Sequence, residues 1–214
     1  MTAWTIWNRW NALKFRRLAI PVTKIIPRAG SLLQEFIAAQ EVPDKPPSVA
    51  VSSQWNPPEF LYYKANFDAA IFKASASAGI SVIIRDSRAN AIGALLVPTH
   101  LSTSIASMEA LAYWRAVLFA KEIGLRQVIF EGDSAVVIWA IIQGNSALAE
   151  YGNIIDDIRS LAVDFDFYHF IHVKRNCNVV VDALTKKAKT LSNLVVWLED
   201  VAEDIAPLLL FDVP

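Results

Sequence analysis

Three strand-like segments follow one another between residues 62 and 97, and they limit the possible folds more than any other feature of the sequence. Residues 62–72 are rich in aromatic and apolar side chains, and residues 79–85 and 92–97 form two further apolar runs. The polar stretch DSRAN at 86–90 separates the second run from the third, and Asp, Ser and Asn favour a hairpin turn. These three segments predict an antiparallel meander.

Beyond the meander, the apolar pattern alternates between helical and strand-like spacing. Gly124 follows a long Ala- and Leu-rich stretch and suits the end of a helix. The predicted elements are helix 104–123, strand 127–131, helices 134–142 and 150–163, strand 165–174 and helix 179–189. The order β-β-β-α-β-α-α-β-α predicts an α/β fold, in which helices flank a five-stranded mixed sheet.

The chain divides by composition into three parts. Residues 42–59 hold five prolines and three serines, which is typical of a linker. We therefore predict a Trp-rich basic N-terminal segment with its linker at 1–61, a folded domain at 62–190 and an acidic C-terminal tail at 191–214. Trp7 and Trp10 are three residues apart and would share a helical face, which is typical of a surface that packs against a partner.

The overall charge argues against a nucleic-acid partner until it is divided along the chain. The sequence has 20 basic and 21 acidic residues, but the last 24 hold five acidic residues and no basic one. The first 30 residues hold six basic residues and no acidic one. That stretch could be a phosphate-contacting arm, an organelle-targeting segment or a helical linker with solvated charges.

Other classes of protein are disfavoured by composition. The single cysteine, Cys177, excludes an internal disulfide framework and Cys-rich zinc sites. Mean hydropathy is +0.34, yet the longest uncharged run, 89–108, contains Pro98 and His100 and is not uniformly apolar. No secretory signal pattern opens the sequence. We expect an intracellular protein, nuclear or cytoplasmic, with no membrane segment.

Four carboxylates stand at unusual or strategic positions in the predicted elements. Asp68 lies in the middle of the first strand, where aspartate is rare. Glu109 lies near the start of the long helix, Asp133 lies where a strand meets a helix, and Asp182 lies near the start of the last helix. Each has an ordinary alternative explanation: an exposed strand residue, a favourable helix-dipole position, a helix N-cap or an i, i+4 pair with Lys186.

Considered together, the four carboxylates suggest a metal site. In a mixed sheet, strand–helix junctions and helix starts can converge on one edge. Clustered carboxylates repel one another unless cations neutralise them, and hard divalent ions prefer oxygen ligands. Two Mg²⁺ ions about 4 Å apart can activate a water and stabilise the leaving oxygen of a phosphodiester.

The motifs that carry these carboxylates resemble the type 1 ribonuclease H domain family, in the plant reverse-transcriptase-like branch associated with non-LTR retrotransposons. The resemblance extends over residues 64–190. The matching motifs are KANFDAA (64–70), GISVIIRDSRAN (79–90), SMEALAYWRAVLFAKEIGLRQVIFEGDS (107–134) and HVKRNCNVVVDALTKKA (172–188).

The resemblance implies a function and a role for each carboxylate. Asp68, Glu109, Asp133 and Asp182 match the family's catalytic residues and metal ligands, with two Mg²⁺ ions, or Mn²⁺, as the cofactor. Asp68 would bridge both ions, and Asp182 would hold one of them. The implied reaction is endonucleolytic hydrolysis of the RNA strand of an RNA–DNA hybrid, which leaves a 3′-OH and a 5′-phosphate.

The sequence also departs from the family pattern. The first motif usually reads Asp-Gly, whereas here Ala69 follows Asp68, and its Cβ could crowd the strand. The loop at 174–178 lacks the histidine that assists turnover in some members. His172 precedes this loop, and we expect it to be a partly buried sheet residue. There is no basic handle insertion, so weak substrate affinity is expected.

A basic cluster surrounds the last carboxylate. We predict nucleic-acid contacts from Lys174, Arg175, Asn176, Lys186 and Lys187. The alternative is a solvated helix face. The departures favour a second functional hypothesis: a catalytically weak or inactive domesticated retroelement domain that binds hybrids, or other nucleic acids, without useful turnover. A third is a protein-interaction role for the two ends of the chain, with partners that the sequence does not identify.

Overall fold

The computed structural model describes residues 2–16, 19–30, 54–100, 104–144 and 149–211. Backbone contacts divide the chain into two units, Met1–Ala50 and Val51–Pro214. The first unit contains helix α1 (Thr2–Lys14), in which Trp7 and Trp10 are both exposed. Most of the predicted linker, residues 42–53, lies outside the described residues.

A mixed sheet forms the centre of the second unit, with the strand order β5-β4-β1-β2-β3-β6. The predicted meander is confirmed, because β1 pairs antiparallel with β2 and β2 pairs antiparallel with β3. Strands β4 and β5 continue the sheet in parallel from β1. The strands are β1 (Tyr63–Phe72), β2 (Ser77–Arg85), β3 (Ala91–His100), β4 (Gln127–Gly132), β5 (Phe167–His172) and β6 (Val195–Leu198).

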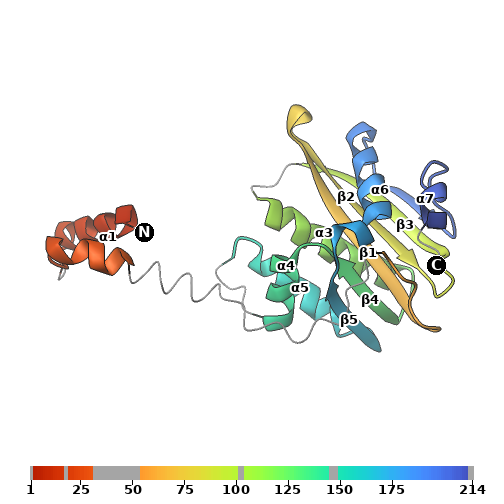
Figure 1. Ribbon diagram of the computed structural model, residues 1–214, viewed down its shortest axis with the longest axis horizontal. Helices are drawn as coiled ribbons and strands as arrows, with labels where there is room; N and C mark the ends of the chain where they lie inside the picture. The colour runs from red at the N-terminus through yellow and green to blue at the C-terminus, as the bar shows by residue number, and fades with distance from the viewer. Residues whose placement is uncertain (1, 17–18, 31–53, 101–103, 145–148, 212–214) are drawn as a thin grey trace. The chain divides into compact units, whose positions relative to one another are not determined.

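The sheet lies between two layers of helices, as the sequence predicts (Figure 1). Alternate residues of β1 face opposite layers: Ala65 and Phe67 enter the larger apolar core beneath α3, while Asp68 faces the side of α6. The α-helices of this unit are α3 (Ile105–Glu122), α4 (Ala135–Gln143), α5 (Gly152–Ala162), α6 (Val179–Lys187) and α7 (Ala206–Phe211). Short 3-10 turns are η2 (Lys73–Ser75), η3 (Arg175–Cys177) and η4 (Ala188–Thr190). None of the described helices is both long and apolar enough to span a bilayer.

The predicted count of five strands is one too low, because β6 pairs antiparallel with the edge of β3. Its four residues alternate between half-buried and exposed side chains, and four residues are too few to show a clear strand period. Beyond it, Val201 and Ile205 are buried in the second apolar cluster, together with residues of α6. The acidic residues of 191–214 therefore share their segment with core-forming apolar ones.

Candidate metal centre

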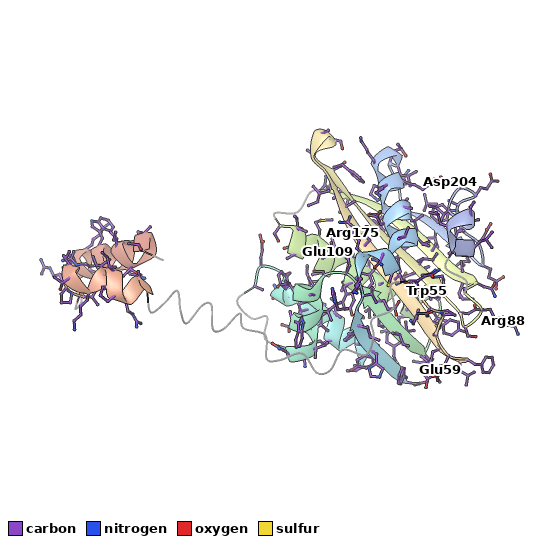
Figure 2. All side chains as sticks on the ribbon, in the orientation of Figure 1. Trp55, Glu59, Arg88, Glu109, Arg175 and Asp204 are labelled. Atoms are coloured by element: carbon purple, nitrogen blue, oxygen red, sulfur yellow. The ribbon has the colours of Figure 1, made fainter. Side chains whose placement is uncertain are left out.

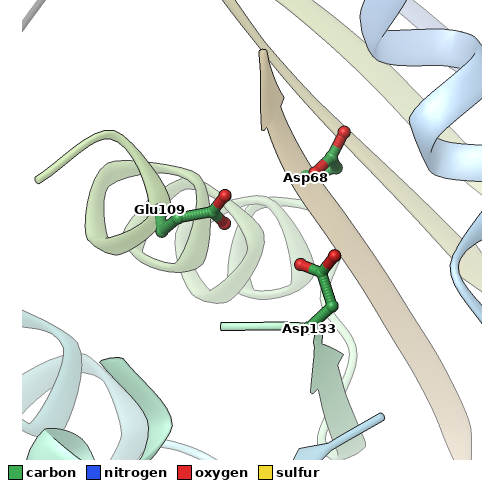
Figure 3. A group of neighbouring side chains, drawn as sticks. All are labelled: Asp68, Glu109 and Asp133. Carbon is green, nitrogen blue, oxygen red and sulfur yellow. The ribbon is translucent and has the colours of Figure 1, made fainter. Parts of the chain in front are cut away.

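Three of the four predicted carboxylates converge in the structure. Asp68, Glu109 and Asp133 each offer one oxygen, and these three oxygens lie within 4.8 Å of one another. Figure 3 shows the three side chains directed toward a common point from a strand, a helix and the segment after β4. The sequence pattern predicts these residues on a strand, near a helix start and at a strand–helix junction, and the fold brings them together.

Local packing explains how Asp133 comes so close to β1. Gly132 precedes it, and a Cβ added there would lie 2.4 Å from Cζ of Phe67. Only glycine leaves room for this aromatic ring beside the end of β4. On α3, Ser104 is the N-cap and accepts a hydrogen bond from the Ser107 backbone N–H, which fixes the start of the helix that carries Glu109.

The site is electrostatically strained without a cation. Burial, followed by the charge of Asp133, raises the pKa of Asp68 to about 6. Burial, followed by the charges of Asp68 and Asp133, raises the pKa of Glu109 to about 8. Glu109 Oε2 is buried and has no hydrogen-bond partner among the described residues. A buried oxygen without a donor, beside two like charges, fits a hard divalent cation, because such an ion accepts oxygen ligands and removes the repulsion.

Asp182, the fourth predicted carboxylate, lies outside this triad. Its Oδ2 lies 2.5 Å from Lys186 Nζ, and its Oδ1 lies 3.3 Å from Arg175 Nη2. Although burial acts in the opposite direction, hydrogen bonds from Lys186 and Arg175 hold the pKa of Asp182 below its usual value. Its charge still raises the pKa of Asp68, so it borders the triad. The structure therefore contains the i, i+4 ion pair between Asp182 and Lys186. This pair engages the carboxylate that the resemblance assigns to a metal ion.

The predicted nucleic-acid-binding residues lie on η3 and the end of α6. Lys174, Arg175 and Asn176 are exposed at η3, and Arg175 lies beside Asp182. Lys186 is exposed on α6, one turn after Asp182. Lys187 forms an ion pair with Asp204 instead. Four of the five side chains are thus accessible to solvent, while Lys187 is paired with the C-terminal segment.

Sequence reasoning missed one supporting residue and misplaced another. Asn178 is buried, and its Nδ2 donates to the Phe67 carbonyl over 2.9 Å, which joins the start of α6 to the residue before Asp68. The expectation that His172 is partly buried is wrong: it is exposed, because β5 is an edge strand, and its Nε2 lies 3.2 Å from the Asp133 carbonyl oxygen. Ala69 does not interrupt the strand, since β1 stays paired with β2 across it.

Comparisons with known proteins agree with this architecture. The sequence profile of the family described as reverse transcriptase-like matches residues 66–188. A solved ribonuclease H1 from the halophilic archaeon Halobacterium salinarum is 20% identical, with a TM-score of 0.55 over 60% of this chain and 98% of its own. A second, LC11-RNase H1, solved in complex with an RNA/DNA hybrid, is 22% identical, with a TM-score of 0.53 over 61% of this chain and 99% of its own. At these identities the likeness shows a shared fold. No curated protein matches the sequence.

Proposed function

We propose that this chain, which belongs to the reverse transcriptase-like family, is a metal-dependent nuclease that hydrolyses the RNA strand of RNA–DNA hybrids. The observation that carries the proposal is the convergence of Asp68, Glu109 and Asp133 on one point, with a buried Glu109 oxygen that no donor among the described residues contacts. The profile match spans all four carboxylates of the motif set. The ribonuclease H1 solved with a hybrid shares the fold, which supports the same substrate class here.

The residues divide into two groups by the part they would play. Asp68, Glu109 and Asp133 would hold one divalent ion. Asp182 would bind a second ion once its ion pair with Lys186 is broken. Two Mg²⁺ ions, or Mn²⁺ with the same oxygen ligands, would activate a water and stabilise the leaving oxygen of the phosphodiester. Lys174 and Arg175 would contact backbone phosphates and orient the hybrid. Recognition would depend on groove shape and 2′-OH groups more than on base sequence.

The test is cleavage of an end-labelled RNA–DNA hybrid by the full chain with and without Mg²⁺. Asp68→Asn is expected to lower the rate by about a hundredfold or more, since it replaces an anionic ligand of the triad by a neutral amide. Asp157→Asn, on the exposed side of α5, is the matched control and should cleave like the wild type. Equal rates for Asp68→Asn and the wild type would contradict the proposal.

A second candidate is a hybrid-binding domain without useful turnover. The ion pairs at Asp182 favour it, because they neutralise the fourth carboxylate without a metal. Retention of a labelled hybrid with no RNA cleavage at millimolar Mg²⁺ would support this candidate over the nuclease.

A further inference from the structure

A buried polar network lies on the sheet beside the proposed metal centre. At its middle is the carboxylate of Glu131, whose Oε2 accepts hydrogen bonds from Trp55 Nε1 at 3.0 Å and Asn66 Nδ2 at 3.1 Å. Its other oxygen lies 2.7 Å from Lys64 Nζ. Glu131 is only 3% exposed, so its charge depends on these three donors.

Trp55 closes the network from a segment upstream of the sheet. Its indole is 2% exposed, and the Arg85 guanidinium carbon lies 3.3 Å from the ring centroid. Arg85 Nη2 in turn donates to Asn66 Oδ1 at 3.0 Å. The ring therefore covers a cation and donates to an anion at the same time, and both are shielded from water. Figure 2 labels this side chain against the sheet.

Two members of the network stand two residues before triad carboxylates. Glu131 on β4 precedes Asp133, which follows the end of that strand, and Asn66 precedes Asp68 on β1. Asn66 and Glu131 are directly opposite each other in the parallel pairing of the two strands. The bond between their side chains therefore joins the two strands that position Asp68 and Asp133.

The same indole also supports the segment that carries Arg175. Trp55 forms a small buried cluster with Ala89, Val173 and Cys177. Val173 and Cys177 flank the exposed residues 174–176, and the Val173 N–H donates to the Gly132 carbonyl at 2.9 Å. The Trp55 side chain is thus linked to the strands that carry Asp68 and lead to Asp133, and it packs against the segment that carries Arg175.

From these contacts we infer that Trp55 and Glu131 are positioning residues for the metal centre, although neither lies among its carboxylates. This inference rests on the proposed function. Trp55 precedes the stretch 66–188 that the family profile matches, so the centre depends on a residue outside that stretch. Removing the indole N–H leaves a buried carboxylate short of a donor, and the two strands can then shift relative to each other.

The experiment measures Mn²⁺ affinity by calorimetry, with the metal alone, on the full chain. Trp55→Phe keeps an aromatic ring and removes the donor, whereas Glu131→Gln keeps the shape and removes the charge. Each is expected to weaken Mn²⁺ binding about tenfold. Trp197→Phe, in β6, is the matched control, because this tryptophan packs against the second apolar cluster instead. Its Mn²⁺ affinity should stay within about twofold of the wild type.

Hybrid cleavage and hydrogen exchange supply the other readouts. Trp55→Phe should lower kcat through the metal centre and raise KM for the hybrid through the segment that carries Arg175. The Val173 and Cys177 amides should exchange faster in Trp55→Phe than in Trp197→Phe.

Wild-type Mn²⁺ affinity in both Trp55→Phe and Glu131→Gln overturns the inference, and so does an equal loss in Trp197→Phe. If the wild type binds Mn²⁺ without cleaving a hybrid, the proposed function fails, and the affinities still decide the positioning role. A wild type that binds no Mn²⁺ overturns both.

Discussion

Lys186 Nζ lies 2.5 Å from Asp182 Oδ2, one helical turn along α6, so the fourth carboxylate of the site is paired with a cation of the protein itself. A second metal ion at Asp182 must compete with this pair. The competition is modest, because Lys186 is exposed and solvent screens its charge.

Lys186→Met is therefore expected to tighten binding of a second divalent ion by about two- to fivefold, the range that exposed ion pairs represent. Calorimetric titration with Mn²⁺ would resolve the weaker step. Lys189→Met, in the exposed part of η4, is the control for lost positive charge. If both variants tighten the weaker step equally, the effect is general electrostatics and the specific pair is irrelevant.

The metal-free fold should lose stability as pH rises. The folded-state pKa values of Asp68 and Glu109, about 6 and about 8, exceed their ordinary values of 3.8 and 4.5. A group with a raised folded pKa contributes stability fully below its unfolded pKa, and this contribution is lost as pH rises through the folded value. The free energy of unfolding from these two groups should therefore fall between about pH 4 and pH 9.

Urea denaturation of the metal-free protein at a series of pH values would check this dependence. Asp68→Asn should reduce this fall by an amount on the order of 3 kcal/mol, because the folded-state pKa of Asp68 is about 6 instead of 3.8 and one pKa unit corresponds to about 1.4 kcal/mol. Asp157→Asn should retain the wild-type dependence. If the free energy of unfolding falls equally with pH in Asp68→Asn and in the wild type, the pKa of Asp68 is not raised in the folded state.

Mg²⁺ should stabilise the protein at pH 8, because a ligand that binds only the folded state raises the free energy of unfolding. At a hundred times its dissociation constant the gain is about 2.7 kcal/mol. Glu109→Gln should lose most of the Mg²⁺-induced rise in Tm, measured by differential scanning calorimetry. Glu122→Gln, near the other end of α3, is the control and should keep it. An undiminished rise in Glu109→Gln would place the ion elsewhere.

The two lysines near the site should differ in their effect on hybrid binding. Lys174 is exposed, whereas Lys187 is paired with Asp204. Lys174→Ala should reduce the slope of log K against log salt by about 0.7 to 0.9, the value for one phosphate contact. Lys187→Ala should change it less. Fluorescence anisotropy at several salt concentrations measures both slopes, and identical slopes in the wild type and Lys174→Ala would remove Lys174 from the interface.

The segment after β6 should contribute to stability in spite of its acidic composition. Ile205 is 3% exposed in the cluster shared with α6, whereas Leu210 is 76% exposed. Ile205→Ala is expected to lower the free energy of unfolding by about 2 to 4 kcal/mol through the lost contacts and the cavity left behind. Leu210→Ala should change it by less than about 0.5 kcal/mol. Chemical denaturation distinguishes them, and equal values would mean that the segment is not packed in solution.

The strands and helices around the site were predictable because each follows a local rule. The meander 62–97 rests on three apolar runs and a polar turn, and β1, β2 and β3 confirm it. The β6 strand was missed because its four residues are too few to show a clear period, and only pairing with β3 makes them a strand. The exposure of His172 likewise follows from the edge position of β5, which depends on the order of strands in the sheet.

By itself the sequence determined that Asp68 stands in the middle of a strand, Glu109 near a helix start and Asp133 where a strand meets a helix, because local periodicity and turn chemistry place those elements. Only the tertiary structure decided that these three meet within 4.8 Å, that Asp182 is held by Lys186, and that Trp55 reaches Glu131 across 76 residues of sequence. The physical reason is that burial, charge pairing and hydrogen-bond donors for a buried carboxylate arise from contacts between distant segments, and no local pattern records them.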